Sequence, residues 1–246
     1  MQFDINSSAF EREHKLIHED GIFCLATYNN LLFTACNKGV LKEFDVLTGE
    51  ILHDYGKICS QRISGIYCYN NTIMVADYSG SVTQICQASK KISKQFGNLH
   101  ESKITSTLGY KDQFFTGDEF SCIKRICISS RCLEQVYEEF LKHEIKKIQI
   151  IDNLFIANSI FGQLKLMNYA TDEIIEEIKD LPTKNVYMFE INNDNLFVMN
   201  ATGELRQFSL SRKILIKKWG KMFRGARVEH MISFSNNLYL CDGDGM

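Results

Sequence analysis

The 246-residue sequence predicts an all-β protein made of repeated four-stranded antiparallel sheets. A pattern recurs every 41 residues and is marked by one turn residue per unit: Gly39, Gly80, Ser121, Gly162 and Gly203. An apolar strand begins 17 residues before each marker, and a polar pair follows that strand at constant spacing. Internal repeats of roughly 40–45 residues are typical of β-propellers, in which each repeat is one blade. The sequence therefore predicts a β-propeller.

The first strand of each unit ends at a pair of residues suited to a tight turn. Asn and Asp tolerate the positive φ that two-residue hairpin turns require, so we predict the first hairpin turn of each unit at these pairs. The pairs are Asn29-Asn30, Asn70-Asn71, Lys111-Asp112, Asp152-Asn153, Asn193-Asp194 and Asn236-Asn237.

The remaining strands differ from one another in polarity. The second strand of each unit is a nearly continuous apolar run, which favours a strand buried on both faces. The marker turn leads into a third strand, and a more polar, outer fourth strand follows. Segments 138–142 and 173–179 have a helix-like composition, but the repeat register assigns them to fourth strands or to the loops that follow.

The two ends of the chain match complementary parts of one repeat. Residues 3–8 resemble 44–49, so the N-terminus supplies a third and a fourth strand, while 228–245 supplies a first and a second strand. We predict one domain over 1–246, a six-bladed β-propeller closed by N- and C-terminal half-blades. The blades span about 18–57, 58–98, 99–141, 142–181 and 182–222, and the composite blade joins 223–246 to 1–17.

At Phe44-Asp45 and Phe3-Asp4 the chain resembles a degenerate member of the WD-repeat family. His18 and His100 stand four residues before a first strand, as the histidine of that family's Gly-His pair does. The third-strand Trp of the family is replaced in every unit, so its histidine–hydroxyl–aspartate–tryptophan network is missing from most blades. The resemblance implies a non-catalytic platform that binds partners on the face carrying the second-to-third-strand turns and the blade-to-blade loops.

Composition favours an intracellular protein. The net charge of −2 indicates no global attraction to nucleic acid or membranes. Nine scattered cysteines, an odd number, indicate a reducing compartment with free thiols. Neither an export signal nor an apolar run long enough to span a bilayer is recognisable, so we expect a cytoplasmic location without a membrane span.

Polar residues stand three positions before the markers, where they should ring the mouth of the propeller channel. The candidate partner-binding residues among them are Asp77, Asp118, Asn200 and Asp242. The acids could hold a cation or receive an Arg or Lys of a partner. Alternatively, they satisfy the backbone N–H groups of their own turns, as Asp and Asn commonly do.

No metal, cofactor or catalytic site is expected. Cys122, Cys127 and Cys132 are five residues apart, which is not a zinc-binding pattern. Cys86 and Cys127 occupy the same position of the repeat, which suggests packing residues. Serine-nucleophile, phosphate-loop and dinucleotide motifs are absent from the sequence.

A basic segment over 206–227 has no acidic residue among its charges. We predict that its part from Lys217 to Arg227 joins the fifth blade to the composite blade, and that the segment forms a binding rim for anions or acidic peptides. The candidate residues are Lys217, Lys218, Lys221, Arg224 and Arg227. Phe223-Arg224-Gly225 is similar to the Phe-Arg-Arg-Gly motif of phosphoinositide-binding propellers but lacks its second arginine. The alternative is a solvated outer strand that faces acids of a neighbouring blade, such as Glu173.

These features predict a protein–protein interaction scaffold of the WD-repeat type, acting as a subunit of a complex. The alternative is a binder of an anionic ligand, phosphoinositide or RNA, through the basic segment. A hydrolase of the six-bladed type ranks last, because the acids at the predicted channel mouth have no matching histidines.

Overall fold

The structure, a computed structural model, describes residues 2–4, 9–12, 17–175, 186–200, 202–212, 214–221, 228–235 and 237–242. These residues form strands, turns and bends; none of them belongs to a helix, so no membrane-spanning helix is present among them. The chain divides into two compact units, Met1–Lys103 and Ile104–Met246, and each is described by itself.

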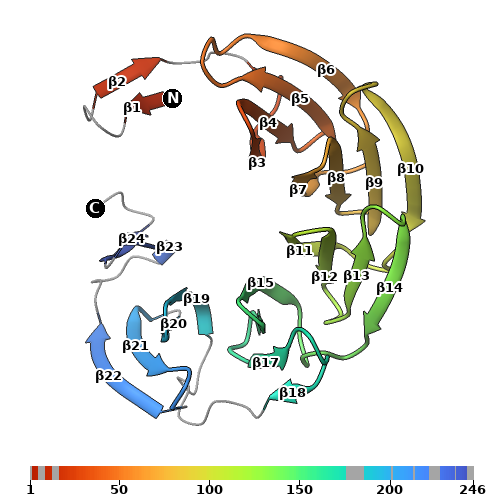
Figure 1. Ribbon diagram of the computed structural model, residues 1–246. Helices are drawn as coiled ribbons and strands as arrows, with labels where there is room; N and C mark the ends of the chain where they lie inside the picture. Colours follow the sequence, from red (N-terminus) through yellow and green to blue (C-terminus); the bar gives the residue numbers. More distant parts are fainter. Residues whose placement is uncertain are drawn as a thin grey trace. The chain divides into compact units, whose positions relative to one another are not determined.

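The first unit contains two four-stranded antiparallel sheets and one hairpin (Figure 1). Its sheets have the strand orders β3-β4-β5-β6 and β7-β8-β9-β10. The strands are β1 (Gln2–Asp4), β2 (Ala9–Arg12), β3 (Ile22–Tyr28), β4 (Leu31–Cys36), β5 (Val40–Asp45), β6 (Ile51–Lys57), β7 (Ile63–Tyr69), β8 (Thr72–Asp77), β9 (Ser81–Cys86) and β10 (Lys91–Asn98).

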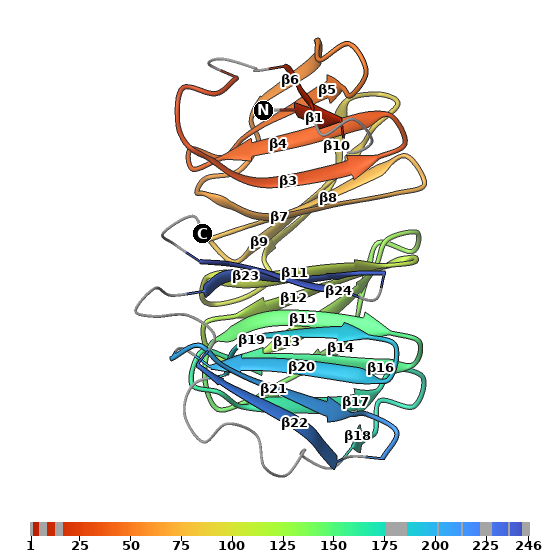
Figure 2. The same ribbon diagram turned by 90° about the vertical axis from the view of Figure 1, so that its left-hand side faces the viewer.

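The second unit contains three four-stranded antiparallel sheets, which follow the chain in order, and the hairpin β23-β24 (Figure 2). The first two sheets are formed by β11 (Ile104–Tyr110), β12 (Gln113–Asp118), β13 (Ile123–Cys127), β14 (Cys132–Tyr137), β15 (Ile145–Ile151), β16 (Leu154–Ser159), β17 (Leu164–Asn168) and β18 (Ile174–Ile175). The remaining strands are β19 (Val186–Asn192), β20 (Asn195–Asn200), β21 (Glu204–Ser209), β22 (Ile214–Lys221), β23 (Val228–Phe234) and β24 (Asn237–Asp242).

The repeated four-stranded antiparallel sheets confirm the all-β prediction. Five such sheets coincide with the five complete units of the repeat. The predicted composite blade is different, because β1-β2 and β23-β24 are two separate two-stranded sheets in the part of the chain that the structure describes. The five complete sheets are therefore established, whereas the sixth blade and the closed ring are not.

Burial follows the predicted polarity of the strands. In β8 and β12 every residue after the first is buried, whereas β10 has no buried residue. The second strands fill the cores between neighbouring sheets of one unit: Phe33 of β4 packs with Ile63 of β7, and Phe115 of β12 packs with Phe155 of β16. Burial on both faces explains why the second strands lack an alternating polar pattern.

Positive φ values lie where the turn chemistry predicts them. Asn29, Asn70, Lys111, Asp152 and Asn193 all have positive φ in the first hairpin turn of their sheets. In the last sequence repeat Ser235 has positive φ, and Asn237 already begins β24. The turn there therefore starts one residue before the predicted pair Asn236-Asn237.

The marker glycines are required by a close backbone approach as well as by φ. Gly80 has φ +83°, and a Cβ there would lie 2.2 Å from the carbonyl oxygen of His100. Gly39 has the same relationship with Cys59, at 2.3 Å. In these two sheets the segment that leaves the sheet therefore runs directly over the second-to-third-strand turn.

Candidate partner-binding surface

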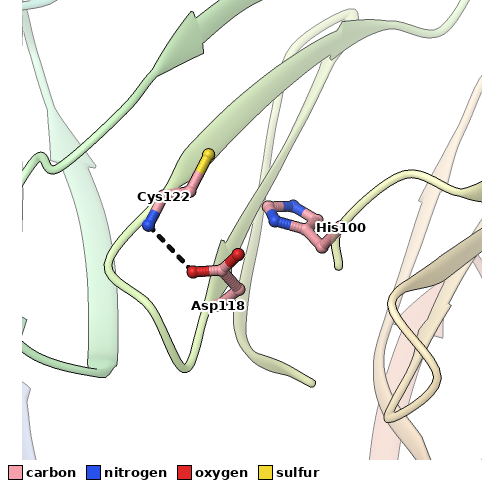
Figure 3. A group of neighbouring side chains, drawn as sticks. All are labelled: His100, Asp118 and Cys122. Carbon is pink, nitrogen blue, oxygen red and sulfur yellow. Dashed lines mark hydrogen bonds between the residues drawn. The ribbon is translucent and has the colours of Figure 1, made fainter. Parts of the chain in front are cut away.

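The polar residues before the markers bind the backbone of their own turns. Asp77 Oδ1 accepts hydrogen bonds from the amides of Ser79 at 2.9 Å and Ser81 at 3.2 Å. Asp118 Oδ1 accepts from the amides of Phe120 at 2.9 Å and Cys122 at 2.8 Å. Figure 3 shows the bond to Cys122 and the neighbouring His100 ring, which has a nitrogen within 4.8 Å of an Asp118 carboxylate oxygen.

Asn200 has the same arrangement in the fifth sequence repeat. Its Oδ1 accepts hydrogen bonds from the amides of Thr202 at 3.0 Å and Glu204 at 2.9 Å. Asp77, Asp118 and Asn200 are 1%, 4% and 7% exposed. In these three residues one side-chain oxygen thus accepts the backbone amides of its own turn, as the second alternative describes.

Asp242, the fourth predicted residue, ends β24, where its backbone is opposite Val228. Its side chain lies outside the described part of the structure. Partner binding through these four positions stays a prediction.

In the third sequence repeat a serine replaces the marker glycine and contacts the next segment with its side chain. Ser121 has φ +67°, and its Oγ donates a 2.8 Å hydrogen bond to the carbonyl oxygen of Leu141. The amide of Phe140 donates to the carbonyl oxygen of Ser121 at 3.0 Å. We call residues 138–144, which leave this sheet, the 138–144 connector.

The 138–144 connector lies between two marker turns of the second unit. On one side it is bonded to Ser121, as described above. On the other side the amide of Lys142 donates to Gln163 Oε1 at 2.7 Å, and the His143 ring lies 4.6 Å from the Phe161 ring. The turns 118–123 and 159–164 therefore flank the connector.

Each of these two turns presents an exposed aromatic side chain. Phe120 is 71% exposed and Phe161 is 57% exposed. In the first, second and fifth sequence repeats the equivalent positions are polar: Lys38, Ser79 and Thr202. The sequence interpretation missed both phenylalanines, although an aromatic residue at a turn position that is polar elsewhere in the repeat was an available signal.

The surroundings of the two phenylalanines are acidic. Glu138 and Glu139 are exposed on the connector, and Glu119 is half-buried beside Phe120. Lys142 is the exposed cation of the connector. This surface, which we call the Phe120/Phe161 surface, combines apolar tips with a net negative charge.

The first unit carries a different aromatic cluster near the same kind of turn. The Arg62 guanidinium lies 3.1 Å from the Phe23 ring centroid and 4.2 Å from that of Tyr78, and it donates a hydrogen bond to the Tyr78 hydroxyl. Stacking between two rings stabilises the guanidinium charge within the chain, although its buried Nε–H has no hydrogen-bond partner among the residues that the structure describes. Phe23 remains 47% exposed.

His18 is a buried residue with a defined partner. Its Nε2 lies 2.7 Å from the hydroxyl oxygen of Thr34 on β4. Burial lowers the pKa of His18 below its usual value, and the nearby Lys42 ammonium lowers it further. The histidine therefore stays neutral at pH 7.

The basic segment is placed partly within a strand. Lys217, Lys218 and Lys221 belong to β22, not to the connection after it, and Lys217 and Lys218 are exposed. Lys221 is opposite Glu204 in the β21–β22 register, so the end of β22 lies at the edge of the sheet that carries the turn before Glu204. Arg224 and Arg227 lie outside the described residues.

Comparisons with known proteins identify the architecture. The chain is similar to a chain in the crystal structure of the mitotic checkpoint complex, with a TM-score of 0.81, 12% identity, and coverage of 99% of this chain and 78% of that chain. It is also similar to the computationally designed Ika8 protein, with a TM-score of 0.78, 18% identity, and coverage of 93% and 70%. For the designed Ika4 protein the values are 0.56, 22%, 61% and 92%.

At these identities the likeness shows the fold alone, which is a β-propeller-like all-β repeat architecture. No family model matches the sequence, and no curated protein matches it.

Proposed function

We propose that this protein is a non-catalytic interaction scaffold of the WD-repeat type, which docks partner proteins on the edge of its sheets that carries the marker turns. The observation behind the proposal is the pair of exposed phenylalanines, Phe120 and Phe161, on two turns that flank one connector. Large aromatic side chains gain the most from burial at an interface, and they are enriched there.

The polar atoms of these turns favour binding over chemistry. The Asp118 carboxylate is buried and accepts two backbone amides, so it holds the turn that presents Phe120. A rigid turn loses little conformational entropy when its tip enters a partner's pocket. The partner segment that fits carries apolar side chains flanked by basic ones, because the surface is acidic around its aromatic tips.

Similarity to a component of a multiprotein complex supports the proposal of protein partners. The neighbour that covers almost the whole of this chain comes from the mitotic checkpoint complex, an assembly of proteins. The buried His18–Thr34 pair supports the WD-repeat resemblance, because that family joins its histidine to a strand hydroxyl. We further propose a cytoplasmic location, in keeping with nine free cysteines.

The proposed architecture is a single domain with six blades, in which the two terminal hairpins form the sixth. In the first unit the open face of the β3-β6 sheet holds an apolar hollow of about 490 Å³, lined by residues such as Leu25 and Leu32, and Leu25 is 62% exposed. In the second unit the cross-strand pair Ile232 and Tyr239 is 60% and 51% exposed. Exposed apolar faces of this kind favour burial, and ring closure would cover both.

The test compares proteins captured from the cells of origin by the parent and by variants. The double substitution Phe120→Ser with Phe161→Ser should lose partners that the parent binds. The matched control is Leu47→Ser, which changes a residue that is 69% exposed in the turn between β5 and β6, at the other end of its sheet. If the double variant and the control capture the same proteins as the parent, the Phe120/Phe161 surface is not the docking site.

A second candidate function is binding of an anionic ligand through the basic segment. The observation in its favour is the exposure of Lys217 and Lys218 on β22, while the nearby acid Glu204 is already bound by Arg206 at 2.8 Å. Vesicles containing phosphoinositide and a short single-stranded RNA are the two probes. Binding of either probe that weakens steeply with salt would support this function, and binding of neither would exclude it.

A further inference from the structure

Two cysteines face each other across the outer strands of the first sheet of the second unit. Cys127, the last residue of β13, is the register partner of Cys132, the first residue of β14. Directly opposed residues of antiparallel strands have side chains on the same face and Cα atoms about 4.5–5.5 Å apart. Disulfides require Cα atoms about 4.4–6.8 Å apart, so the backbone of this pair is already at a bonding distance.

Both thiols are also directed to the turn between them. The amide of Ser130 donates to Cys127 Sγ at 3.5 Å, and the Cys132 thiol donates to the carbonyl oxygen of Ser130 at 3.3 Å. One residue is thus the partner of both sulfur atoms. Both sulfurs therefore lie within hydrogen-bond reach of the backbone of Ser130.

The residues at the repeat position of Cys127 in two other sheets stabilise the turn between the third and fourth strands. Asp45 Oδ1 accepts the amides of Leu47 and Thr48 at 2.8 and 2.7 Å, and Asn168 Oδ1 accepts the amide of Ala170 at 2.9 Å. An oxygen acceptor therefore closes this turn in the first and fourth sequence repeats. A thiol is a much weaker acceptor, so Cys127 closes the turn poorly. In the third sequence repeat the Asp112 carboxylate takes part in the turn: its Oδ1 accepts the amide of Ser129 at 3.1 Å, and its Oδ2 accepts the Cys127 thiol at 3.5 Å. The turn therefore keeps an oxygen acceptor that does not depend on the Cys127 sulfur.

Accessibility and strand register together separate this pair from the other cysteines, because the exposed Cys241 is opposite His230. Cys132 is exposed and Cys127 is half-buried. Burial raises the pKa of Cys68 to about 12 and that of Cys122 to about 11, so those two thiols stay protonated and unreactive. Cys86 occupies the repeat position of Cys127 but is opposite Lys91, so it has no thiol across the strand.

We propose that Cys127 and Cys132 form a reversible dithiol–disulfide modification site, oxidised by a peroxide. The Cys132 thiolate attacks one peroxide oxygen, the O–O bond breaks, and a sulfenic acid and water form after protonation. The Cys127 thiolate then attacks the sulfenic sulfur, the S–O bond breaks, and the second water leaves. Two thiols are oxidised and one hydrogen peroxide is reduced to two waters. A small dithiol or a thioredoxin-type reductant reverses the reaction by thiol–disulfide exchange.

The 246-residue chain can be tested directly because trypsin separates the cysteines. Cleavage after Arg125, Arg131 and Lys142 places Cys127 in the peptide 126–131 and Cys132 in 132–142. After brief treatment with hydrogen peroxide and blocking of free thiols, the two peptides should be found linked, with a mass lower by two hydrogens. A non-reducing gel should show a monomer, and dithiothreitol should separate the peptides.

Variants distinguish the pair from general thiol oxidation. Cys86→Ser is the matched control and should give the linked peptides as the parent does. In Cys127→Ser the remaining Cys132 should stop at the sulfenic acid, which dimedone traps. The proposal is overturned if the parent gives separately oxidised thiols without the link, or if the link occurs only in covalent dimers.

Discussion

Lys90 forms an ion pair with the buried Glu43 of the neighbouring sheet, with Nζ 2.6 Å from Oε2. The same two repeat positions, 82 residues further along, are Arg125 and Asp172, with the charges reversed and Nη1 3.0 Å from Oδ1. A tyrosine donates to the carboxylate in both cases: Tyr55 to Glu43 at 2.6 Å, and Tyr137 to Asp172 at 2.7 Å. Each unit therefore joins two sheets with the same clamp built from opposite charges.

The reversed clamp predicts the result of a charge exchange. Glu43→Arg alone or Lys90→Asp alone places two like charges together beside the buried position and should destabilise strongly, by about 3–5 kcal/mol. The double variant copies the arrangement of Arg125 and Asp172, so it should recover part of the loss, with a coupling of about 1–3 kcal/mol. Urea unfolding of the four proteins measures this. Losses that simply add would show that the two residues do not interact.

The marker turns predict opposite tolerances at Gly80 and Ser121. Gly80→Ala should lower the free energy of unfolding well beyond the roughly 1 kcal/mol of a positive φ, because its Cβ would meet the His100 carbonyl oxygen at 2.2 Å. Ser121→Gly removes φ strain and one hydrogen bond, so it should change stability by less than about 1 kcal/mol. Thermal unfolding of both variants is the measurement. Equal losses would contradict the close approach at Gly80.

His18 predicts a loss of stability in mild acid. Its pKa is lowered in the folded protein, chiefly by burial, so the unfolded chain binds the proton more readily. The stability contribution is present above about pH 6.5, the usual unfolded value, and is lost as the pH falls below it towards the folded pKa. His18→Gln should therefore lose less stability than the parent between pH 7 and 5. Parallel urea titrations with the same pH slope would rule this out.

The proposed closure predicts that residues 1–17 are essential. Their removal deletes β1 and β2 and, in a closed ring, one half of the sixth blade. The loss of a blade interface should exceed the roughly 5–15 kcal/mol that a domain typically holds. The truncated protein should aggregate or melt far below the parent. Differential scanning calorimetry that finds a midpoint within a few degrees of the parent would remove the support for six blades.

The basic segment predicts a kinetic effect rather than a structural one. Reversal of Lys217, Lys218, Lys221, Arg224 and Arg227 to Glu should hardly change stability. Lys217 and Lys218 are exposed, and an exposed charge contributes at most about 1 kcal/mol. Partner association should slow down, and the difference should shrink as salt shortens the Debye length to about 8 Å and below. Stopped-flow or surface-based association rates at two salt concentrations test this. Equal rates at low salt would leave the segment as a solvated strand.

Local chemistry explains why most of the fold could be predicted from the sequence. The φ values at Asn29 and Asp152 depend on residues adjacent in the chain. The burial of β8 and β12 could be predicted from their continuous apolar runs. The glycine at position 80 could be recognised as a marker from its spacing alone. The carbonyl oxygen of His100 that excludes any larger residue there is a tertiary fact.

Side-chain direction and contacts between sheets were decided only by the tertiary structure. The sequence left Asp118 open between a partner and its own turn, and only the folded turn brings two amides to its carboxylate. Glu43 and Lys90 are 47 residues apart, so no local pattern pairs them. Cys127 and Cys132 were spaced wrongly for zinc, yet the strand register makes them direct neighbours. A repeat determines which strands form, whereas the partners of a side chain depend on how the strands and sheets come together.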